Sequence, residues 1–321
     1  MRRVAAYGLT IAVTVVGSCA VRGAAPRDDA ERRAVAFLAR EVPAWSRDNH
    51  CFSCHNNGDA ARALLAAKGR PYGPSADALV DTLGWLERPE RWDTTAVDPA
   101  ISDKTLARLQ FATALASAVE QGRIGNRKLL VQAAELVAND QSPDGSWPIG
   151  ARGSLGTPAT YGRPLATALG RQALASAGAN RFAAPIARAE RWLREQPLEN
   201  VLDASAVLIG LSPDRPGDHS VRRRGFELLK RAQTDRGGWG PFVRSPPEPF
   251  DTALALLAMS RWEDHTEVAS LLRRGRAYLV ASQNEDGSWT ETTRPAGGES
   301  YAQRISTSGW ATLALLATEN P

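Results

Sequence analysis

Three segments of this chain share one pattern, namely QSPDGSW at residues 141–147, QTDRGGW at 233–239 and QNEDGSW at 283–289. Each segment follows a stretch whose apolar residues recur at the i, i+3, i+4 spacing of an amphipathic helix. Gln141 and Gln233 are about twice as far apart as Gln233 and Gln283, which indicates a degenerate copy between them. The stretch 187–196 fits, since it ends in a glutamine but lacks the glycine and tryptophan. The chain is therefore built from repeats of about 45–50 residues.

Each repeat pairs two helical stretches of different character. The first is charged and amphipathic, whereas the second is apolar nearly all round, as in 306–317, which reads STSGWATLALLA. A helix that is apolar on every side must be buried, so the second helices should form an inner ring covered by the first. We expect an all-α (α/α)6 toroid that forms a single domain over residues 28–321. The expected outer helices are 29–46, 75–88, 129–138, 187–196, 225–232 and 275–281, and the expected inner helices are 58–68, 105–119, 163–177, 202–211, 251–261 and 306–317.

Composition excludes several classes of protein. The chain has 321 residues, of which 43% are hydrophobic and 23% charged, which is typical of a globular protein rather than a disordered, collagen-like or multi-span membrane protein. The net charge is only +4 and no basic stripe accompanies it, so we expect no nucleic-acid partner. Three cysteines are too few for a multi-disulfide scaffold.

The N-terminus has the features of an export signal. A basic start at residues 1–3 precedes an apolar run over 4–16, which is too short for a comfortable membrane span. The residues Gly17-Ser18-Cys19 resemble a bacterial lipobox, in which the cysteine is lipidated. We therefore expect residues 1–27 to be a leader and tether, and the protein to be exported to the periplasm or cell envelope. Membrane attachment would occur only through lipidated Cys19; plain cleavage near residues 24–25 and an uncleaved anchor remain alternatives.

The glutamine, turn, glycine and tryptophan that follow each helix resemble the QW repeat of squalene/hopene cyclases, and protein prenyltransferases share that ring architecture. The resemblance implies an enzyme that cyclises an isoprenoid. Those cyclases protonate an alkene with a DxDDTA motif at the start of an inner helix. The matching stretch here, residues 248–253, keeps Asp251-Thr252-Ala253 but carries Phe250 where the proton-donating aspartate is expected. The resemblance thus leaves Asp251 as the candidate catalytic acid, with a helix N-cap as the plain alternative.

One further motif carries chemistry. His50-Cys51-Phe52-Ser53-Cys54-His55 contains C-x-x-C-H, the attachment signature of c-type haem. Cys51 and Cys54 would each form a thioether with haem and His55 would bind the iron, so the motif predicts one covalent haem c. Two alternatives remain. Cys51 and Cys54 could form a disulfide or a thiol redox pair beside His55, or the two cysteines could hold zinc with His50 and His55.

The position of this motif suggests a site. It occupies the place where other repeats carry the glutamine–tryptophan turn, so it should lie where the inner helices begin, at the mouth of an apolar central cavity. Arg163 and Arg304 could pair there with haem propionates or an anionic ligand, and solvated rim charges are the alternative. The other residues expected at this cavity mouth are Tyr161, Asp203, Asp251 and Tyr301.

The same positions bear on the sixth iron ligand. His219 and His265 precede outer helices, and Met259 lies near the far end of an inner helix, so all three belong to the opposite face. An open or weakly ligated iron is therefore predicted.

These patterns favour an exported haem protein that performs redox or ligand-binding chemistry on a hydrophobic or small-molecule ligand, with a possible redox partner. If it is an enzyme, a haem-dependent oxidoreductase is favoured over a cyclase, because the acid motif is incomplete. A terpene cyclase-like enzyme using Asp251 is one alternative. A non-catalytic binding or scaffold module with a Cys51–Cys54 disulfide is another.

Overall fold

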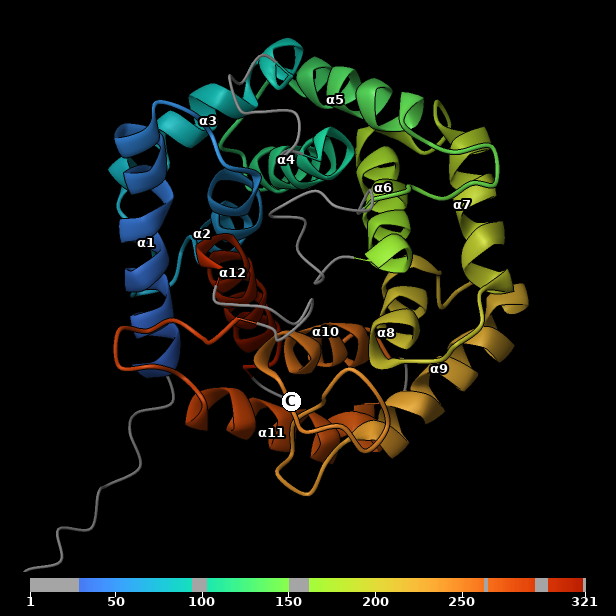
Figure 1. Ribbon diagram of the computed structural model, residues 1–321. Helices are drawn as coiled ribbons and strands as arrows, with labels where there is room; N and C mark the ends of the chain where they lie inside the picture. The colour runs from blue at the N-terminus through green and yellow to red at the C-terminus, as the bar shows by residue number, and fades with distance from the viewer. Residues whose placement is uncertain (1–28, 94–102, 150–161, 263–264, 292–299, 320–321) are drawn as a thin grey trace, which may run out of the picture.

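The computed structural model describes residues 29–93, 103–149, 162–262, 265–291 and 300–319. This part of the chain is helical and without strands. Figure 1 shows an outer ring of helices around an inner ring, so the prediction of an (α/α)6 toroid is confirmed. The outer helices are α1 (Asp29–Asn49), α3 (Val80–Leu86), α5 (Arg127–Asn139), α7 (Ala183–Glu195), α9 (His219–Ala232) and α11 (His265–Ala281). The inner helices are α2 (Ala61–Ala66), α4 (Lys104–Glu120), α6 (Gly162–Gly178), α8 (Val201–Gly210), α10 (Pro249–Met259) and α12 (Tyr301–Ala317). Shorter pieces are η1 (His55–Ala60, a π-helix), η2 (Ala76–Ala78), η3 (Pro89–Arg91) and η4 (Pro216–Asp218).

Burial follows the sequence pattern. Every residue of the inner helix α8 is buried. The outer helix α5 buries one stripe only, made of Leu130, Ala133, Ala134 and Val137. An apolar stripe at this spacing packs a helix onto a core with one face. The apolar core therefore lies largely between the two rings.

The repeated motif ties each outer helix to the next. The Gln233 Nε2 donates to the carbonyl of Gly237 at 2.7 Å and to that of Leu271, on α11, at 2.9 Å. The Trp239 ring is fully buried, and its Nε1 donates to the carbonyl of Leu229 at 2.7 Å. The glutamine thus spans two outer helices, while the tryptophan fixes the chain to the helix it has just left.

The other two motifs repeat this arrangement and close the ring. Gln141 donates to the carbonyl of Pro185 on α7, and Gln283 donates to that of Ala30 on α1, both at 2.9 Å. The last bond joins the last outer helix to the first. The two chain ends of the described ring are therefore held side by side by the motif itself.

Four predicted helices differ clearly from the observed ones. The outer helices α9 and α11 begin at His219 and His265, earlier than the predicted starts at 225 and 275. The outer helix expected over 75–88 is split into η2 and a short α3, and this repeat, like the one at 187–196, lacks the motif. The inner helix expected over 58–68 begins earlier, at His55, because the π-helix η1 runs directly into α2. His55 is therefore the first residue of a helix rather than part of a turn.

The degenerate repeat is joined by charges. No hydrogen bond of the Gln196 side chain is found among the described residues. Instead, Glu190 on α7 forms ion pairs with Arg171 at 2.9 Å, with Arg194 at 3.3 Å and with Arg215. Arg194 also pairs with Asp218 at 2.5 Å, immediately before α9. Ion pairs thus replace the glutamine between these two outer helices.

Three predictions concern residues outside the described ranges. The leader at 1–27, the lipidation of Cys19 and the place of Tyr161 at the cavity mouth therefore stay predictions. In the part of the chain that the structure describes, none of the helices is both long and apolar enough to cross a membrane.

Candidate functional site

The C-x-x-C-H segment lies between α1 and η1. Cys51 and Cys54 are free thiols and partly buried, so the alternative disulfide is not formed in this structure. Phe52 between them stacks on Trp85 of α3, with ring centroids 4.5 Å apart. Burial raises the pKa of the Cys54 thiol to about 12, and the negative charge of Asp59 adds to this effect. Cys54 is thus held as a neutral thiol.

His55 is buried with an unused ring nitrogen. Its side chain is 6% exposed, and its Nδ1 has no hydrogen-bond partner among the described residues. Burial lowers the pKa of His55, and the charge of Asp59 opposes this only in part. A neutral imidazole with a free nitrogen is the form that binds a metal ion.

Two asparagines after His55 form hydrogen bonds to neighbouring helices, as the motif glutamine does in other repeats. Asn56 Nδ2 donates to the carbonyl of Glu41 at 3.1 Å, and Asn57 Nδ2 donates to the Thr82 hydroxyl at 2.8 Å. Both asparagines are fully buried. Asn57 therefore ties the start of the inner helix to α3, and Asn56 ties it to α1. Sequence reasoning missed this role, although the position of the pair in the motif's place was the available signal.

Tyr301 connects this segment with the start of α12. Its hydroxyl donates to Glu41 at 3.0 Å and accepts from Asn56 Nδ2 at 3.0 Å, and its ring stacks on Trp45 with centroids 5.4 Å apart. Burial raises the pKa of Tyr301 to about 12, with Glu41 adding to the shift and Asn56 opposing it. A cavity of about 440 Å³ adjoins Tyr301; the residues that line it are Asn284, Thr290, Glu291, Ser300, Tyr301 and Arg304.

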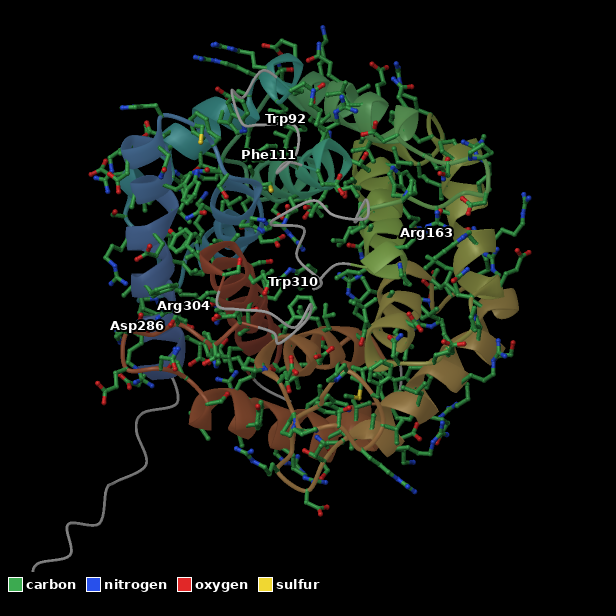
Figure 2. All side chains as sticks on the ribbon, viewed as in Figure 1. Trp92, Phe111, Arg163, Asp286, Arg304 and Trp310 are labelled. Atoms are coloured by element: carbon green, nitrogen blue, oxygen red, sulfur yellow. The ribbon has the colours of Figure 1, made fainter. Side chains whose placement is uncertain are left out.

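The structure does not bring Arg163 and Arg304 together. Arg163 forms an ion pair with Asp144 at 3.5 Å, and Arg304 forms one with Asp286 at 2.6 Å. Both aspartates precede the serine and tryptophan of their own motifs. Figure 2 shows Arg163 on the opposite side of the ring from Arg304. Each arginine therefore neutralises the aspartate of its own repeat, which is close to the alternative of solvated rim charges.

Asp203 sits in a local cap. The Asn200 side chain caps α8 by accepting from the amide of Asp203 at 2.8 Å, while the Asp203 carboxylate accepts from the amide of Glu199 at 3.2 Å. This reciprocal pattern satisfies two free amides of a helix start. Burial raises the pKa of Asp203, and the hydrogen bonds oppose this.

Asp251 is fully buried in the first turn of α10. The alternative in which it caps the helix is wrong, because Glu248 occupies the N-cap position. Phe250 is also fully buried and lies edge-on to Trp310, with ring centroids 6.2 Å apart. Neither Asp251 nor Asp203 lines the cavity beside Tyr301 or the central one.

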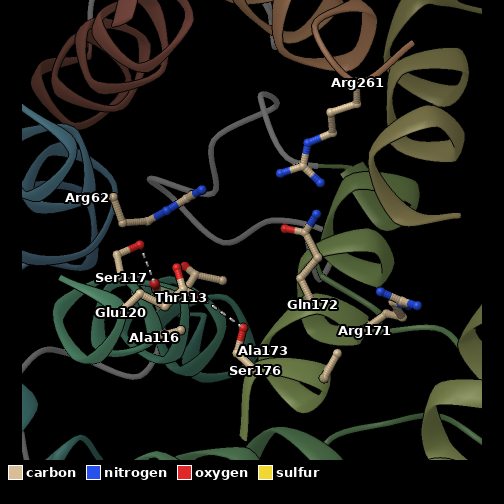
Figure 3. Close-up of a pocket in the computed structure, with 11 residues that line it drawn as sticks. Arg62, Thr113, Ala116, Ser117, Glu120, Arg171, Gln172, Ala173, Ser176 and Arg261 are labelled. Atoms are coloured by element: carbon tan, nitrogen blue, oxygen red, sulfur yellow. Dashed lines mark hydrogen bonds between the residues drawn. The ribbon is translucent and has the colours of Figure 1, made fainter. Parts of the chain in front are cut away.

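A central cavity of about 330 Å³ lies among α2, α4 and α6 (Figure 3). It lies beside the C-terminal halves of α4 and α6, whereas we predicted the mouth at the N-terminal ends of the inner helices. It is also largely polar rather than apolar, because α4 contributes Glu120 and α6 contributes Arg171 and Gln172 to its lining. The residues that line it are Arg62, Thr113, Ala116, Ser117, Glu120, Arg171, Gln172, Ala173, Ala175, Ser176 and Arg261.

A buried aspartate connects the C-x-x-C-H segment with this cavity. Asp59, one turn after His55, is fully buried, and its Oδ2 accepts hydrogen bonds from Gln110 at 2.7 Å, Ser306 at 2.5 Å and Trp310 at 3.2 Å. These donors come from α4 and α12, so Asp59 joins three inner segments. Its Oδ1 lies 3.8 Å from the buried Nη1 of Arg62, and the Arg62 side chain lines the cavity.

The zinc alternative has no donor set in the described ranges. No group of three or more His, Cys, Asp and Glu side chains there is arranged to hold a metal ion. The zinc site that we considered for His50, Cys51, Cys54 and His55 is therefore not formed in this arrangement.

Comparison with known proteins supports the cyclase resemblance. The family described as squalene-hopene cyclase C-terminal domain matches residues 200–321. Drimenyl diphosphate synthase of Streptantibioticus cattleyicolor is 28% identical over 244 residues, which are 70% of this chain and 43% of that protein. The chain thus spans less than half the length of this curated relative.

Solved structures show the same architecture. The type II terpene cyclase MstE from Scytonema aligns with a TM-score of 0.55 and 15% identity, covering 91% of this chain and 98% of that one. A protein from Actinoplanes aligns with a TM-score of 0.55 and 16% identity, covering 91% and 99%. At these identities the likeness establishes the fold: an α/α toroid of the terpene cyclase type.

Proposed function

We propose that this protein is a cyclase-like toroid that binds an isoprenoid ligand among its inner helices. The observation that carries the proposal is the ring itself, closed by its repeated motif and enclosing a cavity large enough for a small-molecule site. Two features of relatives support it. The C-terminal match is to a cyclase domain, and variants of MstE bind geranylgeranyl dihydroxybenzoate or merosterolic acid A.

Cyclisation requires a group that donates a proton to the ligand. A phenyl ring cannot donate a proton to an alkene, so Phe250 removes the acid that the cyclase motif would supply. Asp251 is the adjacent carboxyl group, and it is fully buried. We therefore propose ligand binding as the basal function, with proton-initiated cyclisation through Asp251 as the enzymatic alternative.

The experiment measures binding and turnover separately. Isothermal titration with farnesol reports binding, and gas chromatography with mass spectrometry reports any cyclic product from farnesol or squalene. Four proteins are compared, namely wild type, Asp251→Asn, Phe250→Asp and the surface control Asp235→Asn. Binding without product in the wild type supports a binding protein, and product that Asp251→Asn abolishes supports the enzyme. Product from Phe250→Asp alone would show that only the acid is missing. Absence of binding by all four would refute the proposal.

We propose in addition that Cys51 and Cys54 attach one haem c and that His55 binds its iron. The observation in favour is the donor set: both cysteines are free thiols, and the neighbouring imidazole, whose pKa is lowered by burial, has an unpartnered nitrogen among the described residues. A bound haem would supply a redox-active iron. Haem c is attached outside the cytoplasm, so this proposal requires the predicted export and allows a redox partner in the periplasm or cell envelope.

Co-expression with a haem-attachment system tests this part. A pyridine haemochrome spectrum that survives denaturation is expected for the wild type and lost in Cys51→Ala/Cys54→Ala. Cys19→Ser is the matched control: it should keep the haem but lose membrane association if Cys19 is lipidated. A colourless wild type at good yield would refute the haem and leave the binding proposal standing.

A further inference from the structure

Two arginines point into the central cavity from opposite sides. Figure 3 shows the guanidinium groups of Arg62, from α2, and Arg261, which follows α10, directed toward the same space. The two residues are far apart in the sequence, and the ring brings them together. The cavity therefore brings two positive charges together, although neither arginine belongs to a sequence motif.

Two neighbouring arginines, Arg171 and Arg222, differ from Arg62 and Arg261 because their guanidinium groups already have partners in the protein. Arg171, which also lines the cavity, forms an ion pair with Glu190 at 2.9 Å. Arg222 donates to the carbonyls of Leu208 at 2.8 Å and Leu211 at 2.9 Å, where α8 ends. These two arginines are structural: one balances a buried carboxylate and the other completes a helix end.

Arg62 has strong packing but weak hydrogen bonding. Its guanidinium lies 4.9 Å from the centre of the Trp310 ring, a cation–π contact that fixes the side chain. Its nearest carboxylate oxygen, on Asp59, is 3.8 Å away, and Nη1 is buried without a hydrogen-bond partner among the described residues. The other oxygen of Asp59 is already occupied by three donors. Arg62 is therefore held in place with donor capacity to spare.

Arg261 is similarly placed and, among the described residues, makes only one weak side-chain hydrogen bond. Its bond to the carbonyl of Ile209 is long, at 3.4 Å, and the same carbonyl accepts from Gln172 at 3.1 Å. Desolvation lowers the pKa of Arg261, the positive charges of Arg62 and Arg222 add to this, and the charge of Glu120 opposes it. The carboxylate among the lining residues, Glu120, is exposed and accepts a hydrogen bond from Ser176.

Like charges that share a cavity repel each other, and the nearby C-terminal ends of inner helices offset this only within their last turns. An anion between the two guanidinium groups removes the repulsion and uses their free donors. Guanidinium groups bind phosphate in a fork-like geometry that lysine cannot reproduce. We propose that Arg62 and Arg261 bind a phosphate group in the central cavity. The phosphate is either a free inorganic anion or the head group of an isoprenyl phosphate, and only the second source rests on the proposed function.

Calorimetric titration at low ionic strength distinguishes these sources. The probes are sodium pyrophosphate, farnesyl diphosphate and neutral farnesol, and the proteins are wild type, Arg62→Gln, Arg261→Gln and Arg181→Gln. Arg181 is a matched control because it carries the same charge, is 60% exposed and pairs with Glu135 on the outer ring. Each cavity substitution should weaken binding of both phosphates by about tenfold or more, since a charge-assisted hydrogen bond is lost. The control should leave their affinity unchanged.

The outcomes separate this inference from the proposed function. Farnesyl diphosphate binding more tightly than either pyrophosphate or farnesol supports a head-group site, and equal affinity for the two phosphates supports an inorganic anion. Farnesol binding as tightly as its diphosphate, or a cavity substitution that changes nothing, would overturn the phosphate site but leave isoprenoid binding intact. Binding of pyrophosphate without any binding of farnesol would support the phosphate site and argue against the proposed isoprenoid binding. The Arg261 side chain makes one long hydrogen bond, at 3.4 Å, so its variant keeps the test decisive if Arg62→Gln does not fold.

Discussion

Replacing Asp59 by alanine should loosen the ring where its first and last inner helices meet. The carboxylate accepts from Gln110, Ser306 and Trp310, and all three residues are at most 2% exposed. Alanine would leave three buried donors without an acceptor, at about 1–3 kcal/mol each. Allowing for relaxation of the neighbours, Asp59→Ala should cost about 3–6 kcal/mol of unfolding free energy. A domain of this size loses roughly 2–4 °C of Tm per kcal/mol.

Asparagine separates hydrogen bonding from charge at the same position. Asp59→Asn keeps one oxygen for the three donors, so it should cost about 1–2 kcal/mol, less than alanine. Urea unfolding followed by circular dichroism measures both variants against Asp235→Ala, a surface change expected to stay within about 0.5 kcal/mol. If Asp59→Ala costs no more than the surface control, the network does not stabilise the closure. If asparagine costs as much as alanine, the negative charge matters and the acceptor geometry does not.

Two other predictions concern the repeated turns. Gly237→Ala should lower the unfolding free energy by about 2–4 kcal/mol, because its φ is +89° and an added Cβ would lie 2.6 Å from the carbonyl oxygen of Arg274. Gly84→Ala, inside α3 where a Cβ meets nothing within 4 Å, should instead raise it by up to about 1 kcal/mol; thermal unfolding compares the pair, and equal shifts would contradict the argument. The pKa of Asp144 is lowered, first by the amide two residues on, and that of Asp286 is lowered because its serine and arginine partners outweigh burial. A carboxylate with a lowered folded-state pKa contributes stability above its unfolded pKa near 3.8, and this stability is lost as the pH falls through the folded value. Asp144→Asn/Asp286→Asn should therefore lose less stability than wild type between about pH 5 and pH 2 in urea unfolding, and parallel curves for the two proteins would argue against this.

The ring was predictable because its determinants are local. Glutamine, glycine and tryptophan stand at fixed spacing within seven residues, and the turn they form dictates how one helix pair meets the next. The turn marks the end of a helix better than its start, since α9 and α11 end where predicted but begin earlier. The helix over 75–88 has no such turn to mark its end. The start of the first inner helix was misplaced because Asn56 and Asn57 replace the glutamine by contacts that only the folded chain brings together.

The candidate sites also differ in whether their residues form a local motif or are brought together only by the fold. Cys51, Cys54 and His55 form a contiguous motif that can be recognised without a structure. Arg62 and Arg261 could not be paired from the sequence, because they come from distant repeats and neither belongs to a motif. Arg163 and Arg304 were taken for cavity ligands because nothing in the sequence showed that each would turn back to the aspartate of the preceding turn.

The charged junction between α7 and α9 makes the stability of the ring at that place depend on ionic strength. Three outer-helix junctions depend on glutamine amides bonded to carbonyl groups, which dissolved salt hardly screens. At the junction around Glu190, Arg194 and Asp218 the helices are joined by ion pairs, and salt screens their more exposed members. A closed ring has no ends, but a ring parted there becomes a linear array of helix pairs, and such arrays fray from their ends. Ionic strength would thus select the place at which this molecule begins to unfold.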